Sequence, residues 1–317
     1  MTLKVALQMD PIESIDIKGD SSFVLGLEAQ ARDYELYYYQ PKDLFFDHAQ
    51  GVLADASRLQ LRRKQGDHFT VQPKQRMHIG EFDVILLRQD PPFNMTYLTT
   101  TWLLEHAPAT TLVVNDPKSV RDAPEKLLIT HFPDLIPPTL ITRDQALIEN
   151  FRDQHESIII KPLYGNGGAG IFHLERKDHN LSSLLEIFAE RSNEPLMIQA
   201  FLPEVAQGDK RIILADGKPA GIINRVAAQG EIRSNMHVGG KAIPADYAPR
   251  DLEIIEKIAP ILQRMGLIFA GIDVIGNYLT EINVTSPTGL QEVTNFTGKP
   301  PEKDIWDAIE ARLALRS

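Results

Sequence analysis

A glycine-rich segment in the middle of the chain places the strictest constraint on its fold. Residues 161–170 read Lys-Pro-Leu-Tyr-Gly-Asn-Gly-Gly-Ala-Gly and separate a β-type run at 157–161 from a second one at 170–174. Glycines at this density let the backbone approach an anion with its N–H groups, and Lys161 adds a positive charge. The segment has no G-K-S/T ending and no helix follows it, so it is neither a Walker loop nor a dinucleotide fingerprint. A phosphate-binding loop and a glycine-rich hairpin with a surface lysine both remain open.

The first 115 residues alternate apolar runs with helical patterns, which predicts an open, largely parallel α/β layer. Residues 40–80 have no clean period and predict only a small hairpin excursion. Pro117 and Pro124 punctuate the chain, so we expect a domain boundary near residue 122 and then a helix carrying Lys126. The expected strands are 3–9, 35–39, 82–87 and 111–114, with helices from Asp20 and over 96–106.

Strands and helices continue to the end of the chain. Residues 228–242, in which Gly230, Gly239 and Gly240 bracket polar residues, predict a long mobile loop. The expected strands are 157–161, 170–174, 196–200, 210–215, 218–225, 268–275 and 279–285, with helices over 181–190, 250–265 and 302–315.

Three oxygen-bearing side chains near the C-terminus form a candidate metal site. Glu281 and Asn283 are two apart on a predicted strand and therefore share a face, while Asp273 lies on the neighbouring strand. A three-residue loop would pair Asp273 with Glu281, whereas a two-residue turn would pair it with Thr280 and separate the carboxylates. Two carboxylates and an amide oxygen suit magnesium bridged to phosphates. The alternative is an exposed hairpin face.

Four arginines lie near strand ends or loops: Arg88, Arg211, Arg225 and Arg233. An arginine binds a carboxylate or a phosphate through a two-pronged fork. Arg88 ends a predicted parallel strand, which is where α/β sheets usually bind ligands. Each of the four could equally be a surface salt-bridge residue.

Composition excludes several classes of function. The chain has no cysteine, which removes disulfide frameworks, thiolate metal sites and cysteine nucleophiles. Its histidines show no ligand spacing, and no serine forms a nucleophile elbow. A net charge of −10 disfavours non-specific nucleic-acid binding. No apolar stretch approaches the ~18 residues of a membrane span, and the first apolar run is too short for a signal sequence. We expect a soluble, cytoplasmic protein.

With these segments in place, the chain resembles the bacterial glutathione synthetases, a family of the ATP-grasp superfamily, over nearly its whole length. The glycine loop and the Asp…Glu-Ile-Asn set occur across the superfamily. The opening MDPI, the R-x-DPP turn and the full segment EINVTSPTG are more specific to this branch. The matching segments are MDPI (9–12), ILLRQDPPF (85–93), SVRDAPEKL (119–127), IIIKPLYGNGGAGIF (158–172), GDKRI (208–212), GLIFAGIDVIG (266–276) and LTEINVTSPTG (279–289).

The resemblance implies an N-terminal, Rossmann-like α/β domain at 1–122 that binds substrate and an ATP-grasp domain at 123–317. The ATP-grasp part would be α+β, with a central lid lobe at 123–190 and a C-terminal lobe at 191–317. The implied reaction joins γ-glutamylcysteine to glycine through an acyl phosphate, releasing ADP and phosphate. ATP is the co-substrate, Mg²⁺ is the metal and Mn²⁺ is expected to replace it. The family also suggests a homo-oligomer, most simply a homotetramer.

The same resemblance assigns roles to individual residues. Three groups would hold the nucleotide and its metal, and two would hold the reacting substrates. ATP phosphates would be bound by Lys126, Lys161, Gly165, Asn166, Gly167 and Gly168, adenine by Gln199, Ala200, Phe201 and Leu202, and magnesium by Asp273, Glu281 and Asn283. The catalytic arginines would be Arg211, Arg225 and Arg233, and the substrate contacts Arg88, Ser286, Pro287 and Thr288.

One segment departs from the family pattern. Residues 226–231 differ from the usual sequence, and Lys241 stands where the family often has an arginine, which is not an equivalent fork. The loop's contribution to substrate choice therefore stays open. Two rival functions are a sister ATP-grasp ligase with a different amine acceptor and a non-catalytic, ATP-binding regulatory protein. ADP release that requires both γ-glutamylcysteine and glycine would separate the three.

Overall fold

The N-terminal part of the chain forms a mixed sheet whose centre is parallel, as the sequence predicts. The computed structural model describes residues 2–165, 167–228 and 239–316. Strands β1 (Lys4–Met9), β2 (Glu35–Tyr39), β7 (Val84–Arg88) and β8 (Leu112–Val114) run parallel in the order β2-β1-β7-β8. Helix α1 (Ser21–Ala31) connects β1 to β2 and α2 (Met95–Leu104) connects β7 to β8, while α3 (Pro117–Asp122) follows β8.

Residues 40–80 form far more than the small hairpin that the sequence predicts. The eleven-residue strand β4 (Gly51–Leu61) pairs antiparallel with β2 and extends the sheet beyond it. It shows no single alternation, because Ala54 and Ala56 belong to one core whereas Leu59 and Leu61, at odd positions, belong to the other. The strands paired with it are β3 (Leu44–Asp47), β5 (Phe69–Val71) and β6 (Gln75–His78).

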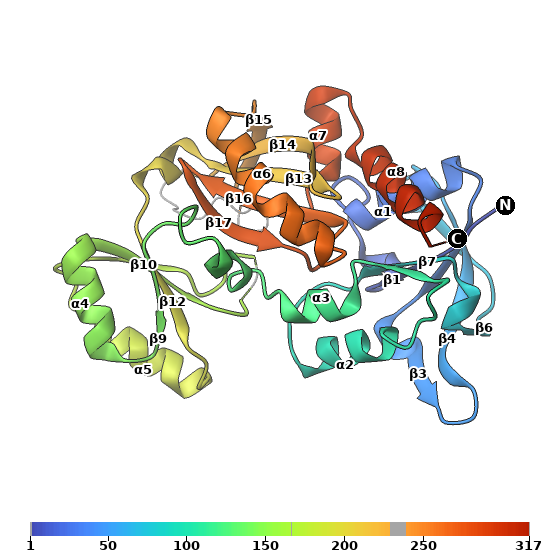
Figure 1. Cartoon of the computed structure of the whole chain (residues 1–317), viewed down its shortest axis with the longest axis horizontal. Coiled ribbons are helices and arrows are strands. Elements are labelled where there is room, and N and C mark those ends of the chain that lie inside the picture. The colour runs from blue at the N-terminus through green and yellow to red at the C-terminus, as the bar shows by residue number, and fades with distance from the viewer. Residues whose placement is uncertain (1, 166, 229–238, 317) are drawn as a thin grey trace.

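A second sheet of four antiparallel strands lies at the opposite end of the molecule (Figure 1). Its strands are β9 (Thr139–Thr142), β10 (Ser157–Pro162), β11 (Phe172–Glu175) and β12 (Leu196–Ala200), in the order β11-β10-β12-β9. Helices α4 (Gln145–His155) and α5 (Leu181–Arg191) bury Ile148 and Leu184 against the strands. Strand β12 belongs to this sheet although it follows residue 190, where we expect one lobe to end.

The third sheet has one apolar face and a second face that is polar at the cleft and buries Ile213 and Ala215 beside the C-terminal helices. Ile212 and Leu214 point toward α6 (Pro249–Arg264), while Asp209 and Arg211 point to the opposite face, because successive strand residues alternate. The strands are β13 (Asp209–Ala215), β14 (Lys218–Val226), β15 (Lys241–Pro244), β16 (Phe269–Ile275) and β17 (Tyr278–Asn283), in the order β15-β14-β13-β16-β17.

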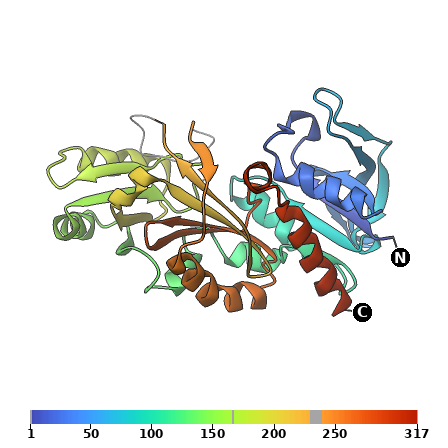
Figure 2. The same cartoon turned by 90° about the horizontal axis from the view of Figure 1, so that it is seen from above.

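The C-terminal helices return to the N-terminal sheet. Helix α8 (Pro301–Ala314) follows α7 (Leu290–Thr297) and lies beside α1, as both views show (Figures 1 and 2). The indole of the fully buried Trp306 donates a hydrogen bond to the carbonyl of Leu25, 2.9 Å away. The side chain of Asn115 also crosses between the parts and donates to the carbonyls of Phe269 and Val284. The first and third sheets are therefore packed together.

The prediction that Lys126 lies on a helix is wrong. Helix α3 ends at Asp122, and residues 125–127 form a turn before the short 3-10 helix η4 (Leu128–His131). Pro124 explains the break, since a proline disfavours helical backbone at the residue before it and Ala123 has φ −120° and ψ 60°. Lys126 thus lies in a turn that faces the third sheet.

Candidate active site

A cleft of about 810 Å³ lies where the three sheets meet, and residues from all three line it. Every described residue that we assign a role from the sequence lies on its wall, from Arg88 on β7 to Asn283 on β17. Asn166 and Arg233 fall outside the described residues, as does most of the loop expected at 228–242. The structure therefore gathers into one site side chains that are up to 200 positions apart in the chain.

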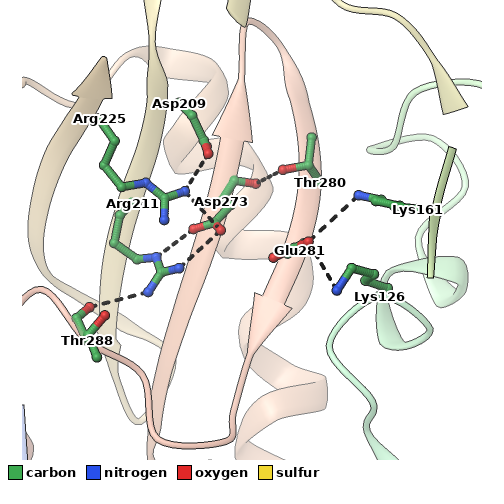
Figure 3. A network of polar contacts seen from close by, with 9 residues as sticks. All are labelled: Lys126, Lys161, Asp209, Arg211, Arg225, Asp273, Thr280, Glu281 and Thr288. Atoms are coloured by element: carbon green, nitrogen blue, oxygen red, sulfur yellow. Dashed lines mark hydrogen bonds and ion pairs between the residues drawn. The ribbon is translucent and has the colours of Figure 1, made fainter. Parts of the chain in front are cut away.

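A β-bulge brings the two candidate metal carboxylates together. The turn between β16 and β17 has two residues, because Ile275 pairs with Tyr278. A two-residue turn alone would place Thr280 opposite Asp273, but the register shifts after Asp273 and pairs it with Glu281. The hydroxyl of the extra residue, Thr280, donates to the backbone carbonyl of Asp273 at 3.1 Å (Figure 3). Asp273 and Glu281 are thus paired, as the alternative with a three-residue loop predicts, although the turn itself has two residues.

Asp273 lies between two buried arginines. The Nε and Nη2 atoms of Arg211 donate to its carboxylate at 2.6 and 3.1 Å, and Nη2 of Arg225 lies 3.0 Å from it (Figure 3). Arg225 also donates to Asp209 at 2.5 Å, so it bridges two acids. Burial raises the pKa of Asp273, but the two guanidinium groups outweigh that effect and leave the pKa below its ordinary value. The acid therefore stays charged and fixes both arginine heads.

Two lysines, one from the turn after α3 and one from strand β10, meet at Glu281. The Nζ atoms of Lys126 and Lys161 lie 3.6 and 3.8 Å from its Oε1 atom (Figure 3). Lys126 also donates to the carbonyl of Gly165 and so ties its turn to the glycine loop. Burial lowers the pKa of Lys161, as does the neighbouring Lys126, while Glu281 opposes the shift. Two ammonium groups this close together form a strong site for an anion.

The glycine loop lies between two strands, as the sequence predicts. Gly167 and Gly168 have φ of +62° and +79°, which disfavours residues with a side chain, and a Cβ added at Gly167 would meet open space. Strands β10 and β11, on either side of the loop, pair antiparallel. The loop therefore presents backbone rather than side chains to the cleft.

The end of β12 and the two residues after it form another wall of the cleft. Gln199 donates its side-chain amide to Thr139 at 3.0 Å, and the ring of Phe201 stacks on His173 with centroids 4.1 Å apart. Ala200 and Leu202 line the same wall. A flat, largely apolar surface beside exposed backbone suits a planar heterocycle.

Arg88 joins the N-terminal sheet to the segment that follows β17. Its Nε atom donates to Ser22 and its Nη2 atom to the carbonyl of Pro287, both at 2.9 Å. Ser286, at φ +49°, donates its hydroxyl to the carbonyl of Arg88, and the carbonyl of Thr288 accepts from Arg211. The third guanidinium nitrogen of Arg88 is buried and has no hydrogen-bond partner among the described residues. A bound carboxylate could supply that partner.

The donor set fits a hard divalent cation. Asp273, Glu281 and Asn283 share the cleft face of the sheet, because Asp273 pairs with Glu281 and Gly271 with Asn283. The buried Asn283 amide has no partner for its nitrogen in the described part of the chain. No group of three His, Cys, Asp or Glu residues that could hold a metal occurs within the described ranges. Two carboxylates and one amide oxygen remain the candidate ligands for Mg²⁺.

Sequence reasoning missed two carboxylates of the cleft. Asp209 shares a face with Arg211 two residues later, and the same period-two argument that pairs Glu281 with Asn283 would have found it. Glu125 precedes Lys126, and burial and the nearby Glu281 raise its pKa to about 7. No local pattern marks Glu125, because its surroundings come from distant parts of the chain.

Lys241, which stands where the family often has an arginine, begins β15 and pairs with Val226 on β14.

The described part of the chain contains no helix long and apolar enough to cross a membrane.

Family models and curated relatives match nearly the whole chain. Residues 3–121 match the N-terminal domain of prokaryotic glutathione synthetase, and residues 125–298 match its ATP-grasp domain. A glutathione synthetase of Brucella melitensis is 52% identical over 98% of this chain and 100% of its own length. Those of Agrobacterium fabrum and Vibrio vulnificus are 51% and 43% identical, covering 97% and 100% of this chain and 96% and 100% of their own lengths.

Solved structures of more distant proteins share the fold. The D-cycloserine synthetase DcsG superimposes with a TM-score of 0.69 at 13% identity, covering 98% of this chain and 99% of its own. The ATP-grasp ligase PsnB, complexed with a minimal precursor, gives a TM-score of 0.65 at 18% identity over the same shares. These similarities establish the ATP-grasp architecture of the chain.

Proposed function

The chain belongs to the prokaryotic glutathione synthetase family, and from this premise we propose how its cleft works. It is an ATP-dependent ligase that forms glutathione. We propose that it does so from γ-glutamylcysteine and glycine through an acyl phosphate. The observation that carries this proposal is the meeting of Lys126, Lys161, Arg211, Arg225 and the acids between them in one cleft.

The nucleotide would occupy the end of the cleft between the second and third sheets. Lys126 and Lys161 would hold its phosphates beneath the glycine loop that includes Gly165, Gly167 and Gly168. The wall of Gln199, Ala200, Phe201 and Leu202 would hold adenine. The loop would also exclude water, which otherwise hydrolyses an acyl phosphate.

Asp273, Glu281 and Asn283 would hold Mg²⁺, which would screen the negative charge of the phosphates. Mn²⁺ offers the same preference for oxygen ligands, and we propose that it substitutes.

The peptide would lie at the other end of the cleft, with its reacting carboxylate near Arg211 and Arg225. Both guanidinium groups are already held by acids, so little conformational entropy is lost when a carboxylate binds. Arg88, with Ser286, Pro287 and Thr288, would bind another polar group of the peptide. The fixed arginines would then stabilise the oxyanion that forms when an amine attacks the acyl carbon.

Two further proposals concern the setting of the enzyme. We propose a homotetramer, on the strength of the family alone, and a cytoplasmic location, where ATP is abundant. Gel filtration with light scattering would test the tetramer, and a monomer would contradict it.

Coupled ADP release tests the reaction, with ATP, magnesium, γ-glutamylcysteine and glycine omitted one at a time. We expect turnover only when all four are present. ADP formed equally well without glycine, but with another amine, would favour a ligase with a different acceptor. Bound ATP without ADP formation on any substrate would favour a regulatory protein.

A further inference from the structure

Glu125 is a carboxylate of the cleft to which the proposed mechanism gives no task. It lies in the turn between α3 and η4, and its backbone carbonyl accepts a hydrogen bond from the N–H of Ile282 at 3.1 Å. Its carboxylate accepts a second hydrogen bond, from the hydroxyl of Thr285. Both contacts come from the segment around the end of β17, so backbone and side chain are fixed against the same wall of the cleft.

The three acids of β13, β16 and β17 that line the cleft already hold cations, and Glu125 does not. Asp209 and Asp273 contact arginines and Glu281 contacts two lysines, whereas Glu125 makes no ion pair within the described ranges. Burial raises its pKa to about 7, and repulsion from Glu281 adds to the shift, although Lys126 and Arg211 oppose it. A partly buried carboxylate without a cation is still costly. A cationic ligand would therefore be favoured beside it.

The position of Glu125 is between the two ends of the cleft. Glu125 lines the cleft together with Lys126, its neighbour in the chain, and Arg211, where the phosphate and the reacting carboxylate would meet. Glu125 also lines a small pocket with Pro91 and Phe93, which follow β7 of the N-terminal sheet. An amine that attacks the acyl carbon must reach the part of the cleft between the nucleotide phosphates and the peptide.

The reaction also needs a proton acceptor there. An amino acid arrives as an ammonium ion, which has no lone pair, and it must lose a proton before it can attack. Asp209 and Asp273 are committed to arginines, and Glu281 is a candidate metal ligand, so none of them is well placed to take that proton.

We propose that Glu125 receives the ammonium group of the incoming amine and takes its proton. This inference rests on the proposed function. The lone pair of the resulting amine adds to the acyl carbon and forms the C–N bond. The C–O bond to phosphate then breaks, its electron pair leaves with phosphate, and phosphate carries away the second proton of the nitrogen. The proton on Glu125 passes to solvent.

Two nucleophiles test this role, because hydroxylamine is largely uncharged at neutral pH and needs no proton acceptor. The Glu125→Gln variant is assayed with γ-glutamylcysteine and either glycine or hydroxylamine, measuring ADP and, for the second, the hydroxamate. We expect the glycine-dependent rate to fall by about 100-fold or more, the lower range for general base catalysis. The hydroxylamine-dependent rate should fall by less than about tenfold, which corresponds to 1.36 kcal/mol. Glu256→Gln, at an exposed position on α6, is the matched control and should leave both rates unchanged.

Three results would overturn the proposal or its premise. Equal losses with both nucleophiles would mean that Glu125 acts before the amine step, and an unchanged rate with glycine would mean that it takes no proton. A wild-type enzyme that makes no ADP with the peptide and either nucleophile would overturn the proposed function itself. If Glu125→Gln does not fold, Thr285→Val removes the hydrogen bond that holds the carboxylate. That variant should show the same selective loss with glycine, and equal losses would refute the proposal.

Discussion

Replacing Asp273 by asparagine tests whether this acid organises the arginines as well as serving as a metal ligand. Its carboxylate accepts two hydrogen bonds from Arg211, at 2.6 and 3.1 Å, and lies 3.0 Å from Arg225. Asparagine has the same shape but carries no charge, and its NH₂ group would face a guanidinium. Arg225 would keep Asp209, whereas Arg211 would lose its only acid among the described residues.

The expected cost is large and is present without any metal. Removing one partner of a buried ion pair costs about 3–5 kcal/mol. The amide oxygen of asparagine still accepts one hydrogen bond, so we expect the lower end, about 3 kcal/mol of unfolding free energy. A carboxylate kept only for metal would have the opposite effect, because its removal would relieve repulsion among the acids of the metal-free cleft.

Urea unfolding in EDTA, followed by tryptophan fluorescence, shows whether Asp273→Asn lowers or raises the unfolding free energy. We expect a lower midpoint for Asp273→Asn at an unchanged slope. Glu281→Gln is the control, since Glu281 contacts its lysines only at 3.6 and 3.8 Å and its side chain is 20% exposed. Within the described part of the chain that variant breaks no hydrogen bond of the carboxylate, so it should cost less unfolding free energy than Asp273→Asn. An Asp273→Asn protein as stable as the wild type in EDTA would refute the reasoning.

Three further predictions concern turnover, packing and pH. Glu281→Gln should lower turnover by about 100-fold but ATP affinity, measured by calorimetry, by less than about tenfold; equal losses would make Glu281 a residue of nucleotide affinity alone. Trp306→Ala should lower the unfolding free energy by about 3–5 kcal/mol, whereas Trp102→Ala, at a side chain 44% exposed, should cost far less; equal costs would contradict the packing of α8 on α1. The raised pKa of Glu125 stabilises the metal-free fold below pH 4.5, and this contribution is lost as pH rises through about 7. Wild-type stability should therefore fall across that window more than that of Glu125→Gln, and identical pH profiles would refute the shift.

The alternation of strand residues explains why the polar side of the site could be predicted. Glu281 and Asn283 share a face because they are two apart on β17, and Asp273 joins them because it pairs with Glu281. The bulge after Asp273 could not be predicted, since a bulge leaves no mark in a short apolar strand. Counting residues in the turn gave two alternatives, a two-residue turn with Asp273 opposite Thr280 and a three-residue loop with Asp273 opposite Glu281. The structure has the two-residue turn and the pairing with Glu281.

The parts that sequence reasoning missed depend on contacts between distant segments. Strand β4 pairs with four other strands and contributes Ala54 and Ala56 to one core and Leu59 and Leu61 to the other, so it shows no single alternation. Glu125 is unusual only because Thr285 and Glu281 fold against it from 160 and 156 positions away. The return of Trp306 to Leu25 likewise joins two helices from opposite ends of the chain. Local patterns predicted elements, whereas these features follow from tertiary packing.

Oxygen transfer tests the central claim most directly, that the cleft turns a peptide carboxylate into an acyl phosphate. The enzyme is supplied with γ-glutamylcysteine labelled with ¹⁸O in its cysteinyl carboxylate, together with ATP, magnesium and glycine, and the released phosphate is analysed by mass spectrometry. The account predicts one ¹⁸O atom in each phosphate, because a carboxylate oxygen attacks the γ-phosphorus and leaves with it. Phosphate without ¹⁸O, released alongside glutathione, would contradict the account.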